Sequence, residues 1–175
     1  VTDLDLAVDR VEEALRIKEM MAPFRVPLII NDRLDVALAV RADGVHVGQE
    51  EMPYETARRL MGPKAIIGLS VETWADVEKA QDLDADYLGV SPVFETPTKT
   101  DTKRSWGLDG LAKIRTRLRH PLVGIGGLNS ANAADAILSG AEPIYVPLHP
   151  PGSGFDEDDL AKAFAQQPKA IVVCN

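Results

Sequence analysis

The chain has very few of the residues that build disulfides, cysteine-based metal sites or membrane spans. Its single cysteine, Cys174, excludes an internal disulfide, and this favours a reducing compartment such as the cytoplasm. No apolar run approaches the roughly 18 residues of a membrane-spanning helix, and no signal peptide is visible. No Ser/His/Asp set, HExxH motif or cysteine-based metal motif can be assembled. The sequence therefore offers no obvious protein nucleophile.

Positive charge is also in short supply, because 27 acidic residues outnumber 19 basic ones and give a formal net charge of −8. An acidic chain without a basic stripe is a poor partner for nucleic acid or for an anionic membrane. With 175 residues, 45% hydrophobic and 26% charged, the chain has the size and composition of one globular domain. We therefore expect a single domain over residues 1–175 that binds small molecules, and pairing into a homo-oligomer stays open.

Short, nearly continuous apolar runs alternate with segments of helical periodicity. Such runs are typical of strands buried on both faces. They occupy residues 26–30, 44–47, 65–69, 86–90, 121–125 and 144–148. Strand alternating with helix predicts a parallel sheet, either open and doubly wound or closed as a (β/α)8 barrel.

The helices are predicted from apolar spacing and from their caps. Apolar residues recur at helical spacing in two sets, Leu4, Val8, Val11 and Leu15, and Leu108, Leu111, Ile114 and Leu118. Thr73 and Asp76 predict a capping box at the start of another helix, and Ser130 predicts an N-cap. We interpret these faces as packing surfaces.

Two loops at predicted strand ends suit a phosphate group. In parallel α/β folds the carboxyl ends of the strands lie on one face, and ligands bind there. The loop ETPTKTDTKRSWG (95–107) gathers hydroxyls around Lys99, while GIGGLNSAN (124–132) places Gly126 and Gly127 between a strand and a helix. Glycines let backbone N–H groups approach an anion closely. The loops together predict a phosphate site, although the first one alone is equally consistent with a solvated surface loop.

Acidic residues follow two neighbouring predicted strands. Asn31 and Asp32 end one strand, and Glu50 and Glu51 follow the next. Carboxylates at such positions suit Mg²⁺ when phosphate oxygens complete its shell, and helix capping is the alternative interpretation. We interpret Asp35 as a helix or surface residue rather than a ligand. His46 lies within a predicted strand, and we expect it to be packed and hydrogen-bonded rather than catalytic.

Several short motifs occur in a characteristic order along residues 26–141: IND, GVHVGQ, GLS, TPTK and GIGG. In this order they resemble the thiamine-phosphate synthase family. The resemblance implies a (β/α)8 barrel. It also implies a Mg²⁺-dependent transferase that joins 4-amino-2-methyl-5-(diphosphooxymethyl)pyrimidine to thiazole phosphate and releases diphosphate.

The resemblance also implies the site, residue by residue. Its metal ligands would be Asp32 and Glu51. Its substrate-binding residues would be Asn31, Ser70, Thr96, Thr98, Lys99 and Gly127. Asn31 and Ser70 would contact the pyrimidine and Lys99 its diphosphate, so that Ser70 and Lys99 count as catalytic. The threonines and the glycine would hold the thiazole phosphate.

The chain departs from the family pattern in three places. Glu51 stands where the family usually has aspartate. The family's Q-x-R-x-K strand end is absent, because helix-like sequence precedes residue 26, so that the first barrel strand is cut short and the second is missing or lies outside this sequence. Leu148 replaces an expected serine that contacts phosphate. The segment PKAIVVCN (168–175) predicts an additional strand, and we expect it to fill the vacated barrel position.

Two other functions compete with the synthase. A thiazole tautomerase on the same scaffold tends to carry a histidine after the GxS strand end and lacks TPTK, whereas this chain has SVET and keeps TPTK. A non-catalytic protein that binds phosphorylated ligands would be left if loss of the Q-x-R-x-K strand had removed the reaction.

Overall fold

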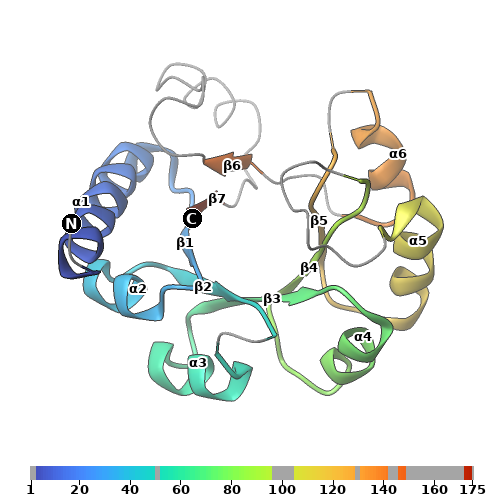
Figure 1. The fold of residues 1–175 in the computed structure, drawn as a ribbon, viewed down its shortest axis with the longest axis horizontal. Helices are drawn as coiled ribbons and strands as arrows, with labels where there is room; N and C mark the ends of the chain where they lie inside the picture. The colour runs from blue at the N-terminus through green and yellow to red at the C-terminus, as the bar shows by residue number, and fades with distance from the viewer. Residues whose placement is uncertain are drawn as a thin grey trace.

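The computed structural model describes residues 3–49, 52–95, 105–128, 131–141, 146–148 and 172–174. Figure 1 shows helices along the outside of a curved wall of strands. The strands are β1 (Leu28–Asn31), β2 (Gly44–Val47), β3 (Ile66–Val71), β4 (Tyr87–Val90), β5 (Leu122–Gly124), β6 (Val146–Leu148) and β7 (Val172–Cys174). Every apolar run that predicted a strand therefore overlaps one.

The strands form one parallel sheet in the order β5-β4-β3-β2-β1-β7-β6. All six pairings are parallel, which confirms the α/β class and the parallel sheet. Within the described residues the sheet ends at β5 on one side and at β6 on the other. Closure into a (β/α)8 barrel therefore stays a prediction.

The additional strand predicted near the end of the sequence pairs directly with β1. Leu28, Ile29 and Ile30 of β1 lie in register with Val172, Val173 and Cys174 of β7. An uncovered strand edge leaves backbone N–H and C=O groups without partners, and β7 covers that edge of β1. Residues 3–27 contain only a helix and a short 3-10 turn, as the helix-like sequence there predicts.

The helices are α1 (Asp3–Met21), α2 (Leu34–Val40), α3 (Tyr54–Met61), α4 (Trp74–Ala80), α5 (Gly107–Arg117) and α6 (Ala133–Leu138), with a 3-10 turn at Ala22–Phe24. None of these helices is long and apolar enough to cross a bilayer. The predicted apolar face of α5 is confirmed, since Leu111, Ile114 and Leu118 are buried.

The predicted apolar face of α1 is confirmed only in part, since Val11 packs against the hydrophobic core and two other residues of the face do not. Val8 and Leu15 are 48% and 44% exposed, whereas Ala14 and Met21 are buried. The helix is rotated so that Lys18 reaches the end of α2, where its Nζ donates to the carbonyl oxygen of Val40 at 2.9 Å. Lys18 thereby provides a donor for a carbonyl group at the end of α2.

The two predicted caps have different outcomes. At α4, Thr73 Oγ1 accepts the Asp76 N–H at 3.2 Å, and Asp76 Oδ2 accepts the Thr73 N–H at 2.8 Å, so the capping box is confirmed. At α6 the N-cap is Asn132, so the prediction of Ser130 as the cap was wrong, and Ser130 itself lies outside the described residues. Asn132 Nδ2 donates to the carbonyl oxygen of Gly127 at 3.0 Å, which ties α6 to the preceding loop.

Alternate strand residues face the helices and the hollow of the sheet, because successive side chains point to opposite faces. Val45, Val47, Leu69 and similar residues pack with helix side chains in one hydrophobic core. We call the opposite side, turned away from the helices, the inner face. On it the register places Asn31 beside His46, His46 beside Gly68, and Gly68 beside Tyr87.

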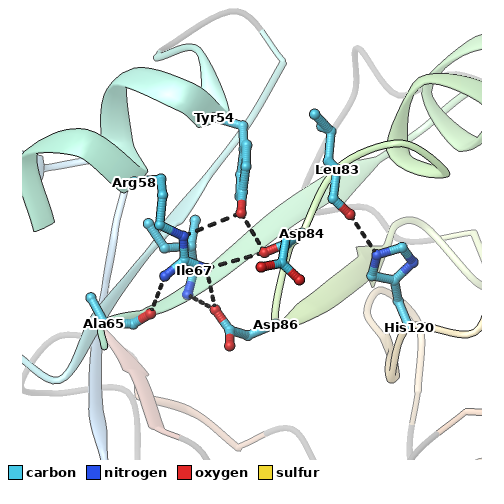
Figure 2. A network of polar contacts seen from close by, with 8 residues as sticks. All are labelled: Tyr54, Arg58, Ala65, Ile67, Leu83, Asp84, Asp86 and His120. Carbon is cyan, nitrogen blue, oxygen red and sulfur yellow. Dashed lines mark hydrogen bonds and ion pairs between the residues drawn. The ribbon is translucent and has the colours of Figure 1, made fainter. Parts of the chain in front are cut away.

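A polar network joins α3 to the amino-terminal ends of β3 and β4 (Figure 2). Arg58 donates to the carbonyl oxygen of Ala65 at 2.6 Å and to Asp86 Oδ2 at 2.7 Å. The same carboxylate oxygen accepts the Ile67 N–H at 2.8 Å. Tyr54 donates its hydroxyl to the carbonyl oxygen of Asp84. Residues at this end of a parallel α/β sheet act on stability, because ligands bind at the opposite end.

Replacing Arg58 with alanine is expected to lower the free energy of unfolding by about 2 kcal/mol, because charge-assisted hydrogen bonds to partly buried acceptors are lost. Urea unfolding measures the change. Arg59, the next residue on α3, is exposed and gives the matched control Arg59→Ala, for which we expect little change. Equal unfolding midpoints for the two variants would contradict a structural role for the network.

Candidate functional site

The described site residues lie at the carboxyl ends of three strands or directly after them. Asn31 ends β1 and Asp32 follows it, Ser70 lies near the end of β3, and Gly127 lies three residues beyond β5. The other predicted residues, Glu51, Thr96, Thr98 and Lys99, lie outside the described residues. Parallel strands place their carboxyl ends at one edge of the sheet, so the described positions share one face.

Asp32 is held in a left-handed backbone conformation at the end of β1. Its φ is 60°, and its N–H donates to the carbonyl oxygen of His46 at 2.8 Å, which extends the pairing of β1 with β2. Asn31 Nδ2 donates to Asp32 Oδ2 at 2.7 Å. The Asp32 residue is exposed. An accessible carboxylate therefore stands at the sheet edge with the neighbouring amide on one of its oxygens.

Arg33, the residue after Asp32, forms an ion pair with the carboxylate of Asp35. Arg33 donates through Nε and Nη2 to the two oxygens of Asp35, at 2.8 and 2.6 Å. These hydrogen bonds lower the pKa of the Asp35 carboxyl to about 2. Asp35 is exposed in the first turn of α2, which confirms its interpretation as a helix or surface residue.

Among the described site residues, Asp32 supplies one carboxylate for a magnesium ion. Within the described ranges no three His, Cys, Asp or Glu side chains gather into a metal cluster. Mg²⁺ does not require such a cluster, because it commonly uses one or two carboxylates, water and substrate phosphates. The exposed Asp32 carboxylate fits that mode of binding, and the second expected ligand, Glu51, lies beyond the described positions.

Ser70 is linked to a buried histidine on the adjacent strand. His46 Nε2 lies 2.8 Å from Ser70 Oγ, and His46 Nδ1 lies 3.0 Å from the Tyr87 hydroxyl. His46 is 5% exposed and Tyr87 3%. Gln49 Nε2 also donates to the Ser70 carbonyl oxygen at 2.7 Å. The serine is therefore held through both its side chain and its backbone.

Glycines on the inner face make room for this pair of rings. A Cβ added at Gly68 would lie 2.1 Å from Tyr87 Cζ and 2.4 Å from His46 Nδ1. A Cβ added at Gly89 would lie 2.8 Å from His46 Cε1. The expectation that His46 is packed and hydrogen-bonded is confirmed. Its contact with Ser70 was missed, although the alternation of valines with His46 in GVHV already placed the ring on the inner face.

The glycine loop after β5 is hydrogen-bonded to the segment that follows β4. Val93 N–H donates to the Ile125 carbonyl oxygen at 2.7 Å, and Phe94 N–H donates to that of Gly126 at 3.0 Å. Gly126 and Gly127 have φ values of 90° and 66°, where L side chains are disfavoured. The segment that leads into the first loop predicted to hold phosphate thus lies against the second, while most of the first loop lies outside the described residues.

Comparisons with known proteins agree on one family. The family described as thiamine monophosphate synthase matches residues 6–147. A thiamine-phosphate synthase of Albidiferax ferrireducens is 52% identical over 79% of this chain and 63% of its own length. One of Chloroflexus aurantiacus is 48% identical over 93% of this chain and 72% of its own. The chain thus spans about two thirds of the length of these curated relatives.

Solved structures give the same picture of the fold. A thiamine phosphate pyrophosphorylase from Pyrococcus furiosus superposes with a TM-score of 0.69 at 38% identity, covering 77% of this chain and 64% of that one. A phosphoribosyl anthranilate isomerase from Thermotoga maritima superposes with a TM-score of 0.56 at 22% identity, covering 94% of this chain and 69% of that one. The second likeness concerns the fold alone.

Proposed function

This chain belongs to the thiamine monophosphate synthase family, and from that premise we propose that it catalyses the synthesis of thiamine phosphate. The substrates are 4-amino-2-methyl-5-(diphosphooxymethyl)pyrimidine and thiazole phosphate, and the second product is diphosphate. The observation that carries the proposal is the placement of Asn31, Asp32 and Ser70 at the carboxyl ends of β1 and β3, on either side of β2, within the stretch that matches the family.

The reaction needs no protein nucleophile. The carbon–oxygen bond between the pyrimidine methylene and diphosphate breaks, the bond electrons leave with the diphosphate, and the thiazole nitrogen supplies the pair for the new carbon–nitrogen bond. Residues that orient the two substrates and stabilise the leaving charge are sufficient. This requirement agrees with a site built from an amide, a hydroxyl, carboxylates and Lys99.

The proposed roles divide between the two substrates. Asn31 and Ser70 orient the pyrimidine, and Lys99 stabilises the departing diphosphate. Thr96, Thr98 and Gly127 hold the phosphate of the thiazole. These small phosphorylated compounds are the partners we propose for the chain.

Asp32 and Glu51 would hold Mg²⁺. When bound, the ion neutralises negative charge on the diphosphate. The main-chain hydrogen bond from Asp32 N–H to the carbonyl oxygen of His46 fixes the backbone position from which the Asp32 carboxylate extends. Asn31, which donates to Asp32 Oδ2, orients the carboxylate further.

The proposal is tested by mixing the protein with both substrates and Mg²⁺ and measuring thiamine phosphate by chromatography. We expect product that is lost on addition of EDTA and restored by excess Mg²⁺. Wild-type protein that binds both phosphorylated compounds and forms no product would overturn the proposal in favour of a non-catalytic binding protein.

Lys99→Ala separates an enzyme from a binding protein. We expect the variant to lose turnover, because a cation that stabilises a leaving group is worth roughly 100-fold or more in rate. Lys103→Ala, in the same predicted loop, removes the same charge and is the matched control. If Lys99→Ala turned over at the wild-type rate, the assignment of this lysine would be wrong.

A further inference from the structure

We propose that His46 is a positioning residue that fixes the Ser70 hydroxyl toward the pyrimidine substrate. The inference rests on the proposed function for the identity of that substrate. It rests on the geometry of the inner face for everything else. His46 acts through Ser70 and is held from behind by Tyr87.

The need for such a residue follows from the freedom of a serine side chain. Its hydroxyl rotates about two bonds, and a partner that fixes its direction reduces the cost of ordering it when substrate binds. His46 Nε2 lies 2.8 Å from Ser70 Oγ, a normal hydrogen-bond distance. Ser70 is half-buried while His46 is buried, so the serine lies between the ring and the exposed strand ends.

The imidazole itself has little freedom to move. Its ring stacks on Tyr87 with centroids 5.4 Å apart and an interplanar angle of 26°. Gly68 and Gly89 lie so close that a methyl group at either would collide with the ring. A residue packed this tightly keeps its hydrogen-bonding atoms in place, which is what a positioning role requires.

The chain of three polar groups also couples the orientation of one hydroxyl to the other. In one arrangement the Tyr87 hydroxyl donates to Nδ1, and Nε2–H donates to Ser70 Oγ, which leaves the serine proton for the substrate. In the other, Nδ1–H donates to Tyr87, and the serine donates to Nε2 and offers only its oxygen lone pairs. The imidazole tautomer thus decides whether Ser70 donates or accepts toward the pyrimidine.

His46 also reaches the metal side of the site through its backbone. Its carbonyl oxygen accepts the Asp32 N–H at 2.8 Å, while its ring contacts Ser70. A shift of this one residue would therefore disturb both groups, so its replacement must be compared with variants that preserve its shape.

Two amides provide that comparison. Glutamine places its terminal nitrogen close to the position of Nε2, and asparagine places its own close to Nδ1. We expect His46→Gln, which can still reach Ser70, to retain much more activity than His46→Asn, for which kcat/KM falls by up to roughly 100-fold. The loss should fall mainly on kcat and on KM for the pyrimidine, with KM for thiazole phosphate unchanged.

A double-mutant cycle shows whether His46 acts through Ser70. If it does, His46→Asn lowers kcat/KM by less than about twofold further once Ser70→Ala is present. Independent, multiplicative losses in the double variant would overturn the proposal. Melting temperatures of all variants exclude unfolding as the cause of the losses.

A second measurement does not depend on turnover. In ¹⁵N NMR spectra of the imidazoles, assigned with His120→Gln and His149→Gln variants, Ser70→Ala should shift His46 Nε2 and leave Nδ1 nearly unchanged. Tyr87→Phe should do the reverse. If the wild-type protein makes no thiamine phosphate while the two variants show these shifts, the proposed function is overturned and the contact between His46 and Ser70 is established. Absence of both shifts would overturn the contact itself.

Discussion

Asp32→Asn is expected to lower kcat/KM for thiamine phosphate formation by roughly 100-fold or more. The substitution removes the negative charge that would hold Mg²⁺ at the leaving diphosphate. The melting temperature should stay close to that of the wild type. The Mg²⁺ concentration for half-maximal rate should rise at the same time, which a metal titration at saturating substrate measures.

Asparagine is the right replacement because of the backbone at this position. Asp32 has a φ of 60°, and among residues with a side chain asparagine is one of those that tolerate this region best. Alanine would remove the charge and add conformational strain, so its effect could not be divided between the two causes. The amide also keeps a polar group within reach of Asn31.

Asp35→Asn is the matched control for this experiment. It removes the same charge three residues away, on an exposed side chain paired with Arg33. The carboxyl of Asp35 has a lowered pKa, so it contributes stability above about pH 4, and that contribution is lost as the pH falls toward 2. At neutral pH we expect a change in rate below about twofold. Equal losses in both variants would mean that net charge, not ligation, explains the effect.

The sheet was predictable because its signal is local. Buried parallel strands need continuous apolar residues, so each run such as 44–47 or 86–90 identifies its own strand without information from elsewhere. The face of α1 was not predictable in this way. The observed orientation of α1 goes with a hydrogen bond from Lys18 to the end of α2, a contact between residues 22 positions apart. Apolar spacing alone favoured Val8 and Leu15, which lie on the exposed side.

The same distinction applies to the site. The positions of Asn31, Asp32, Ser70 and Gly127 at or after strand ends were predictable because their motifs mark strand ends, whereas their roles in binding stay predictions. The link from Ser70 to His46 depends on the register of β2 against β3, which places His46 beside Gly68. No spacing within either strand encodes that register. Gly68 was recognised only as part of the GLS motif, and its role as space for His46 and Tyr87 emerges from the packed structure.

Gly127→Ala is expected to raise KM for thiazole phosphate at least about tenfold, equivalent to about 1.4 kcal/mol of binding free energy. It should also lower the free energy of unfolding. The φ of 66° imposes about 1–2 kcal/mol of strain on any residue with a Cβ. The new methyl would in addition lie 2.7 Å from Phe94 Cβ and 2.9 Å from the Glu95 carbonyl oxygen. Those residues lead directly into Thr96, Thr98 and Lys99 in the sequence.

Gly107→Ala separates the two causes, because Gly107 has nearly the same φ, 62°, with open space where its Cβ would stand. Backbone strain alone would destabilise both variants equally and leave KM near its wild-type value in each. A collision that displaces the loop after β4 would raise KM in Gly127→Ala alone. Equal KM values in the two variants would show that the close approach of the loops does not position the phosphate. An effect confined to Gly127→Ala would make this glycine a determinant of phosphate binding through the space that it leaves.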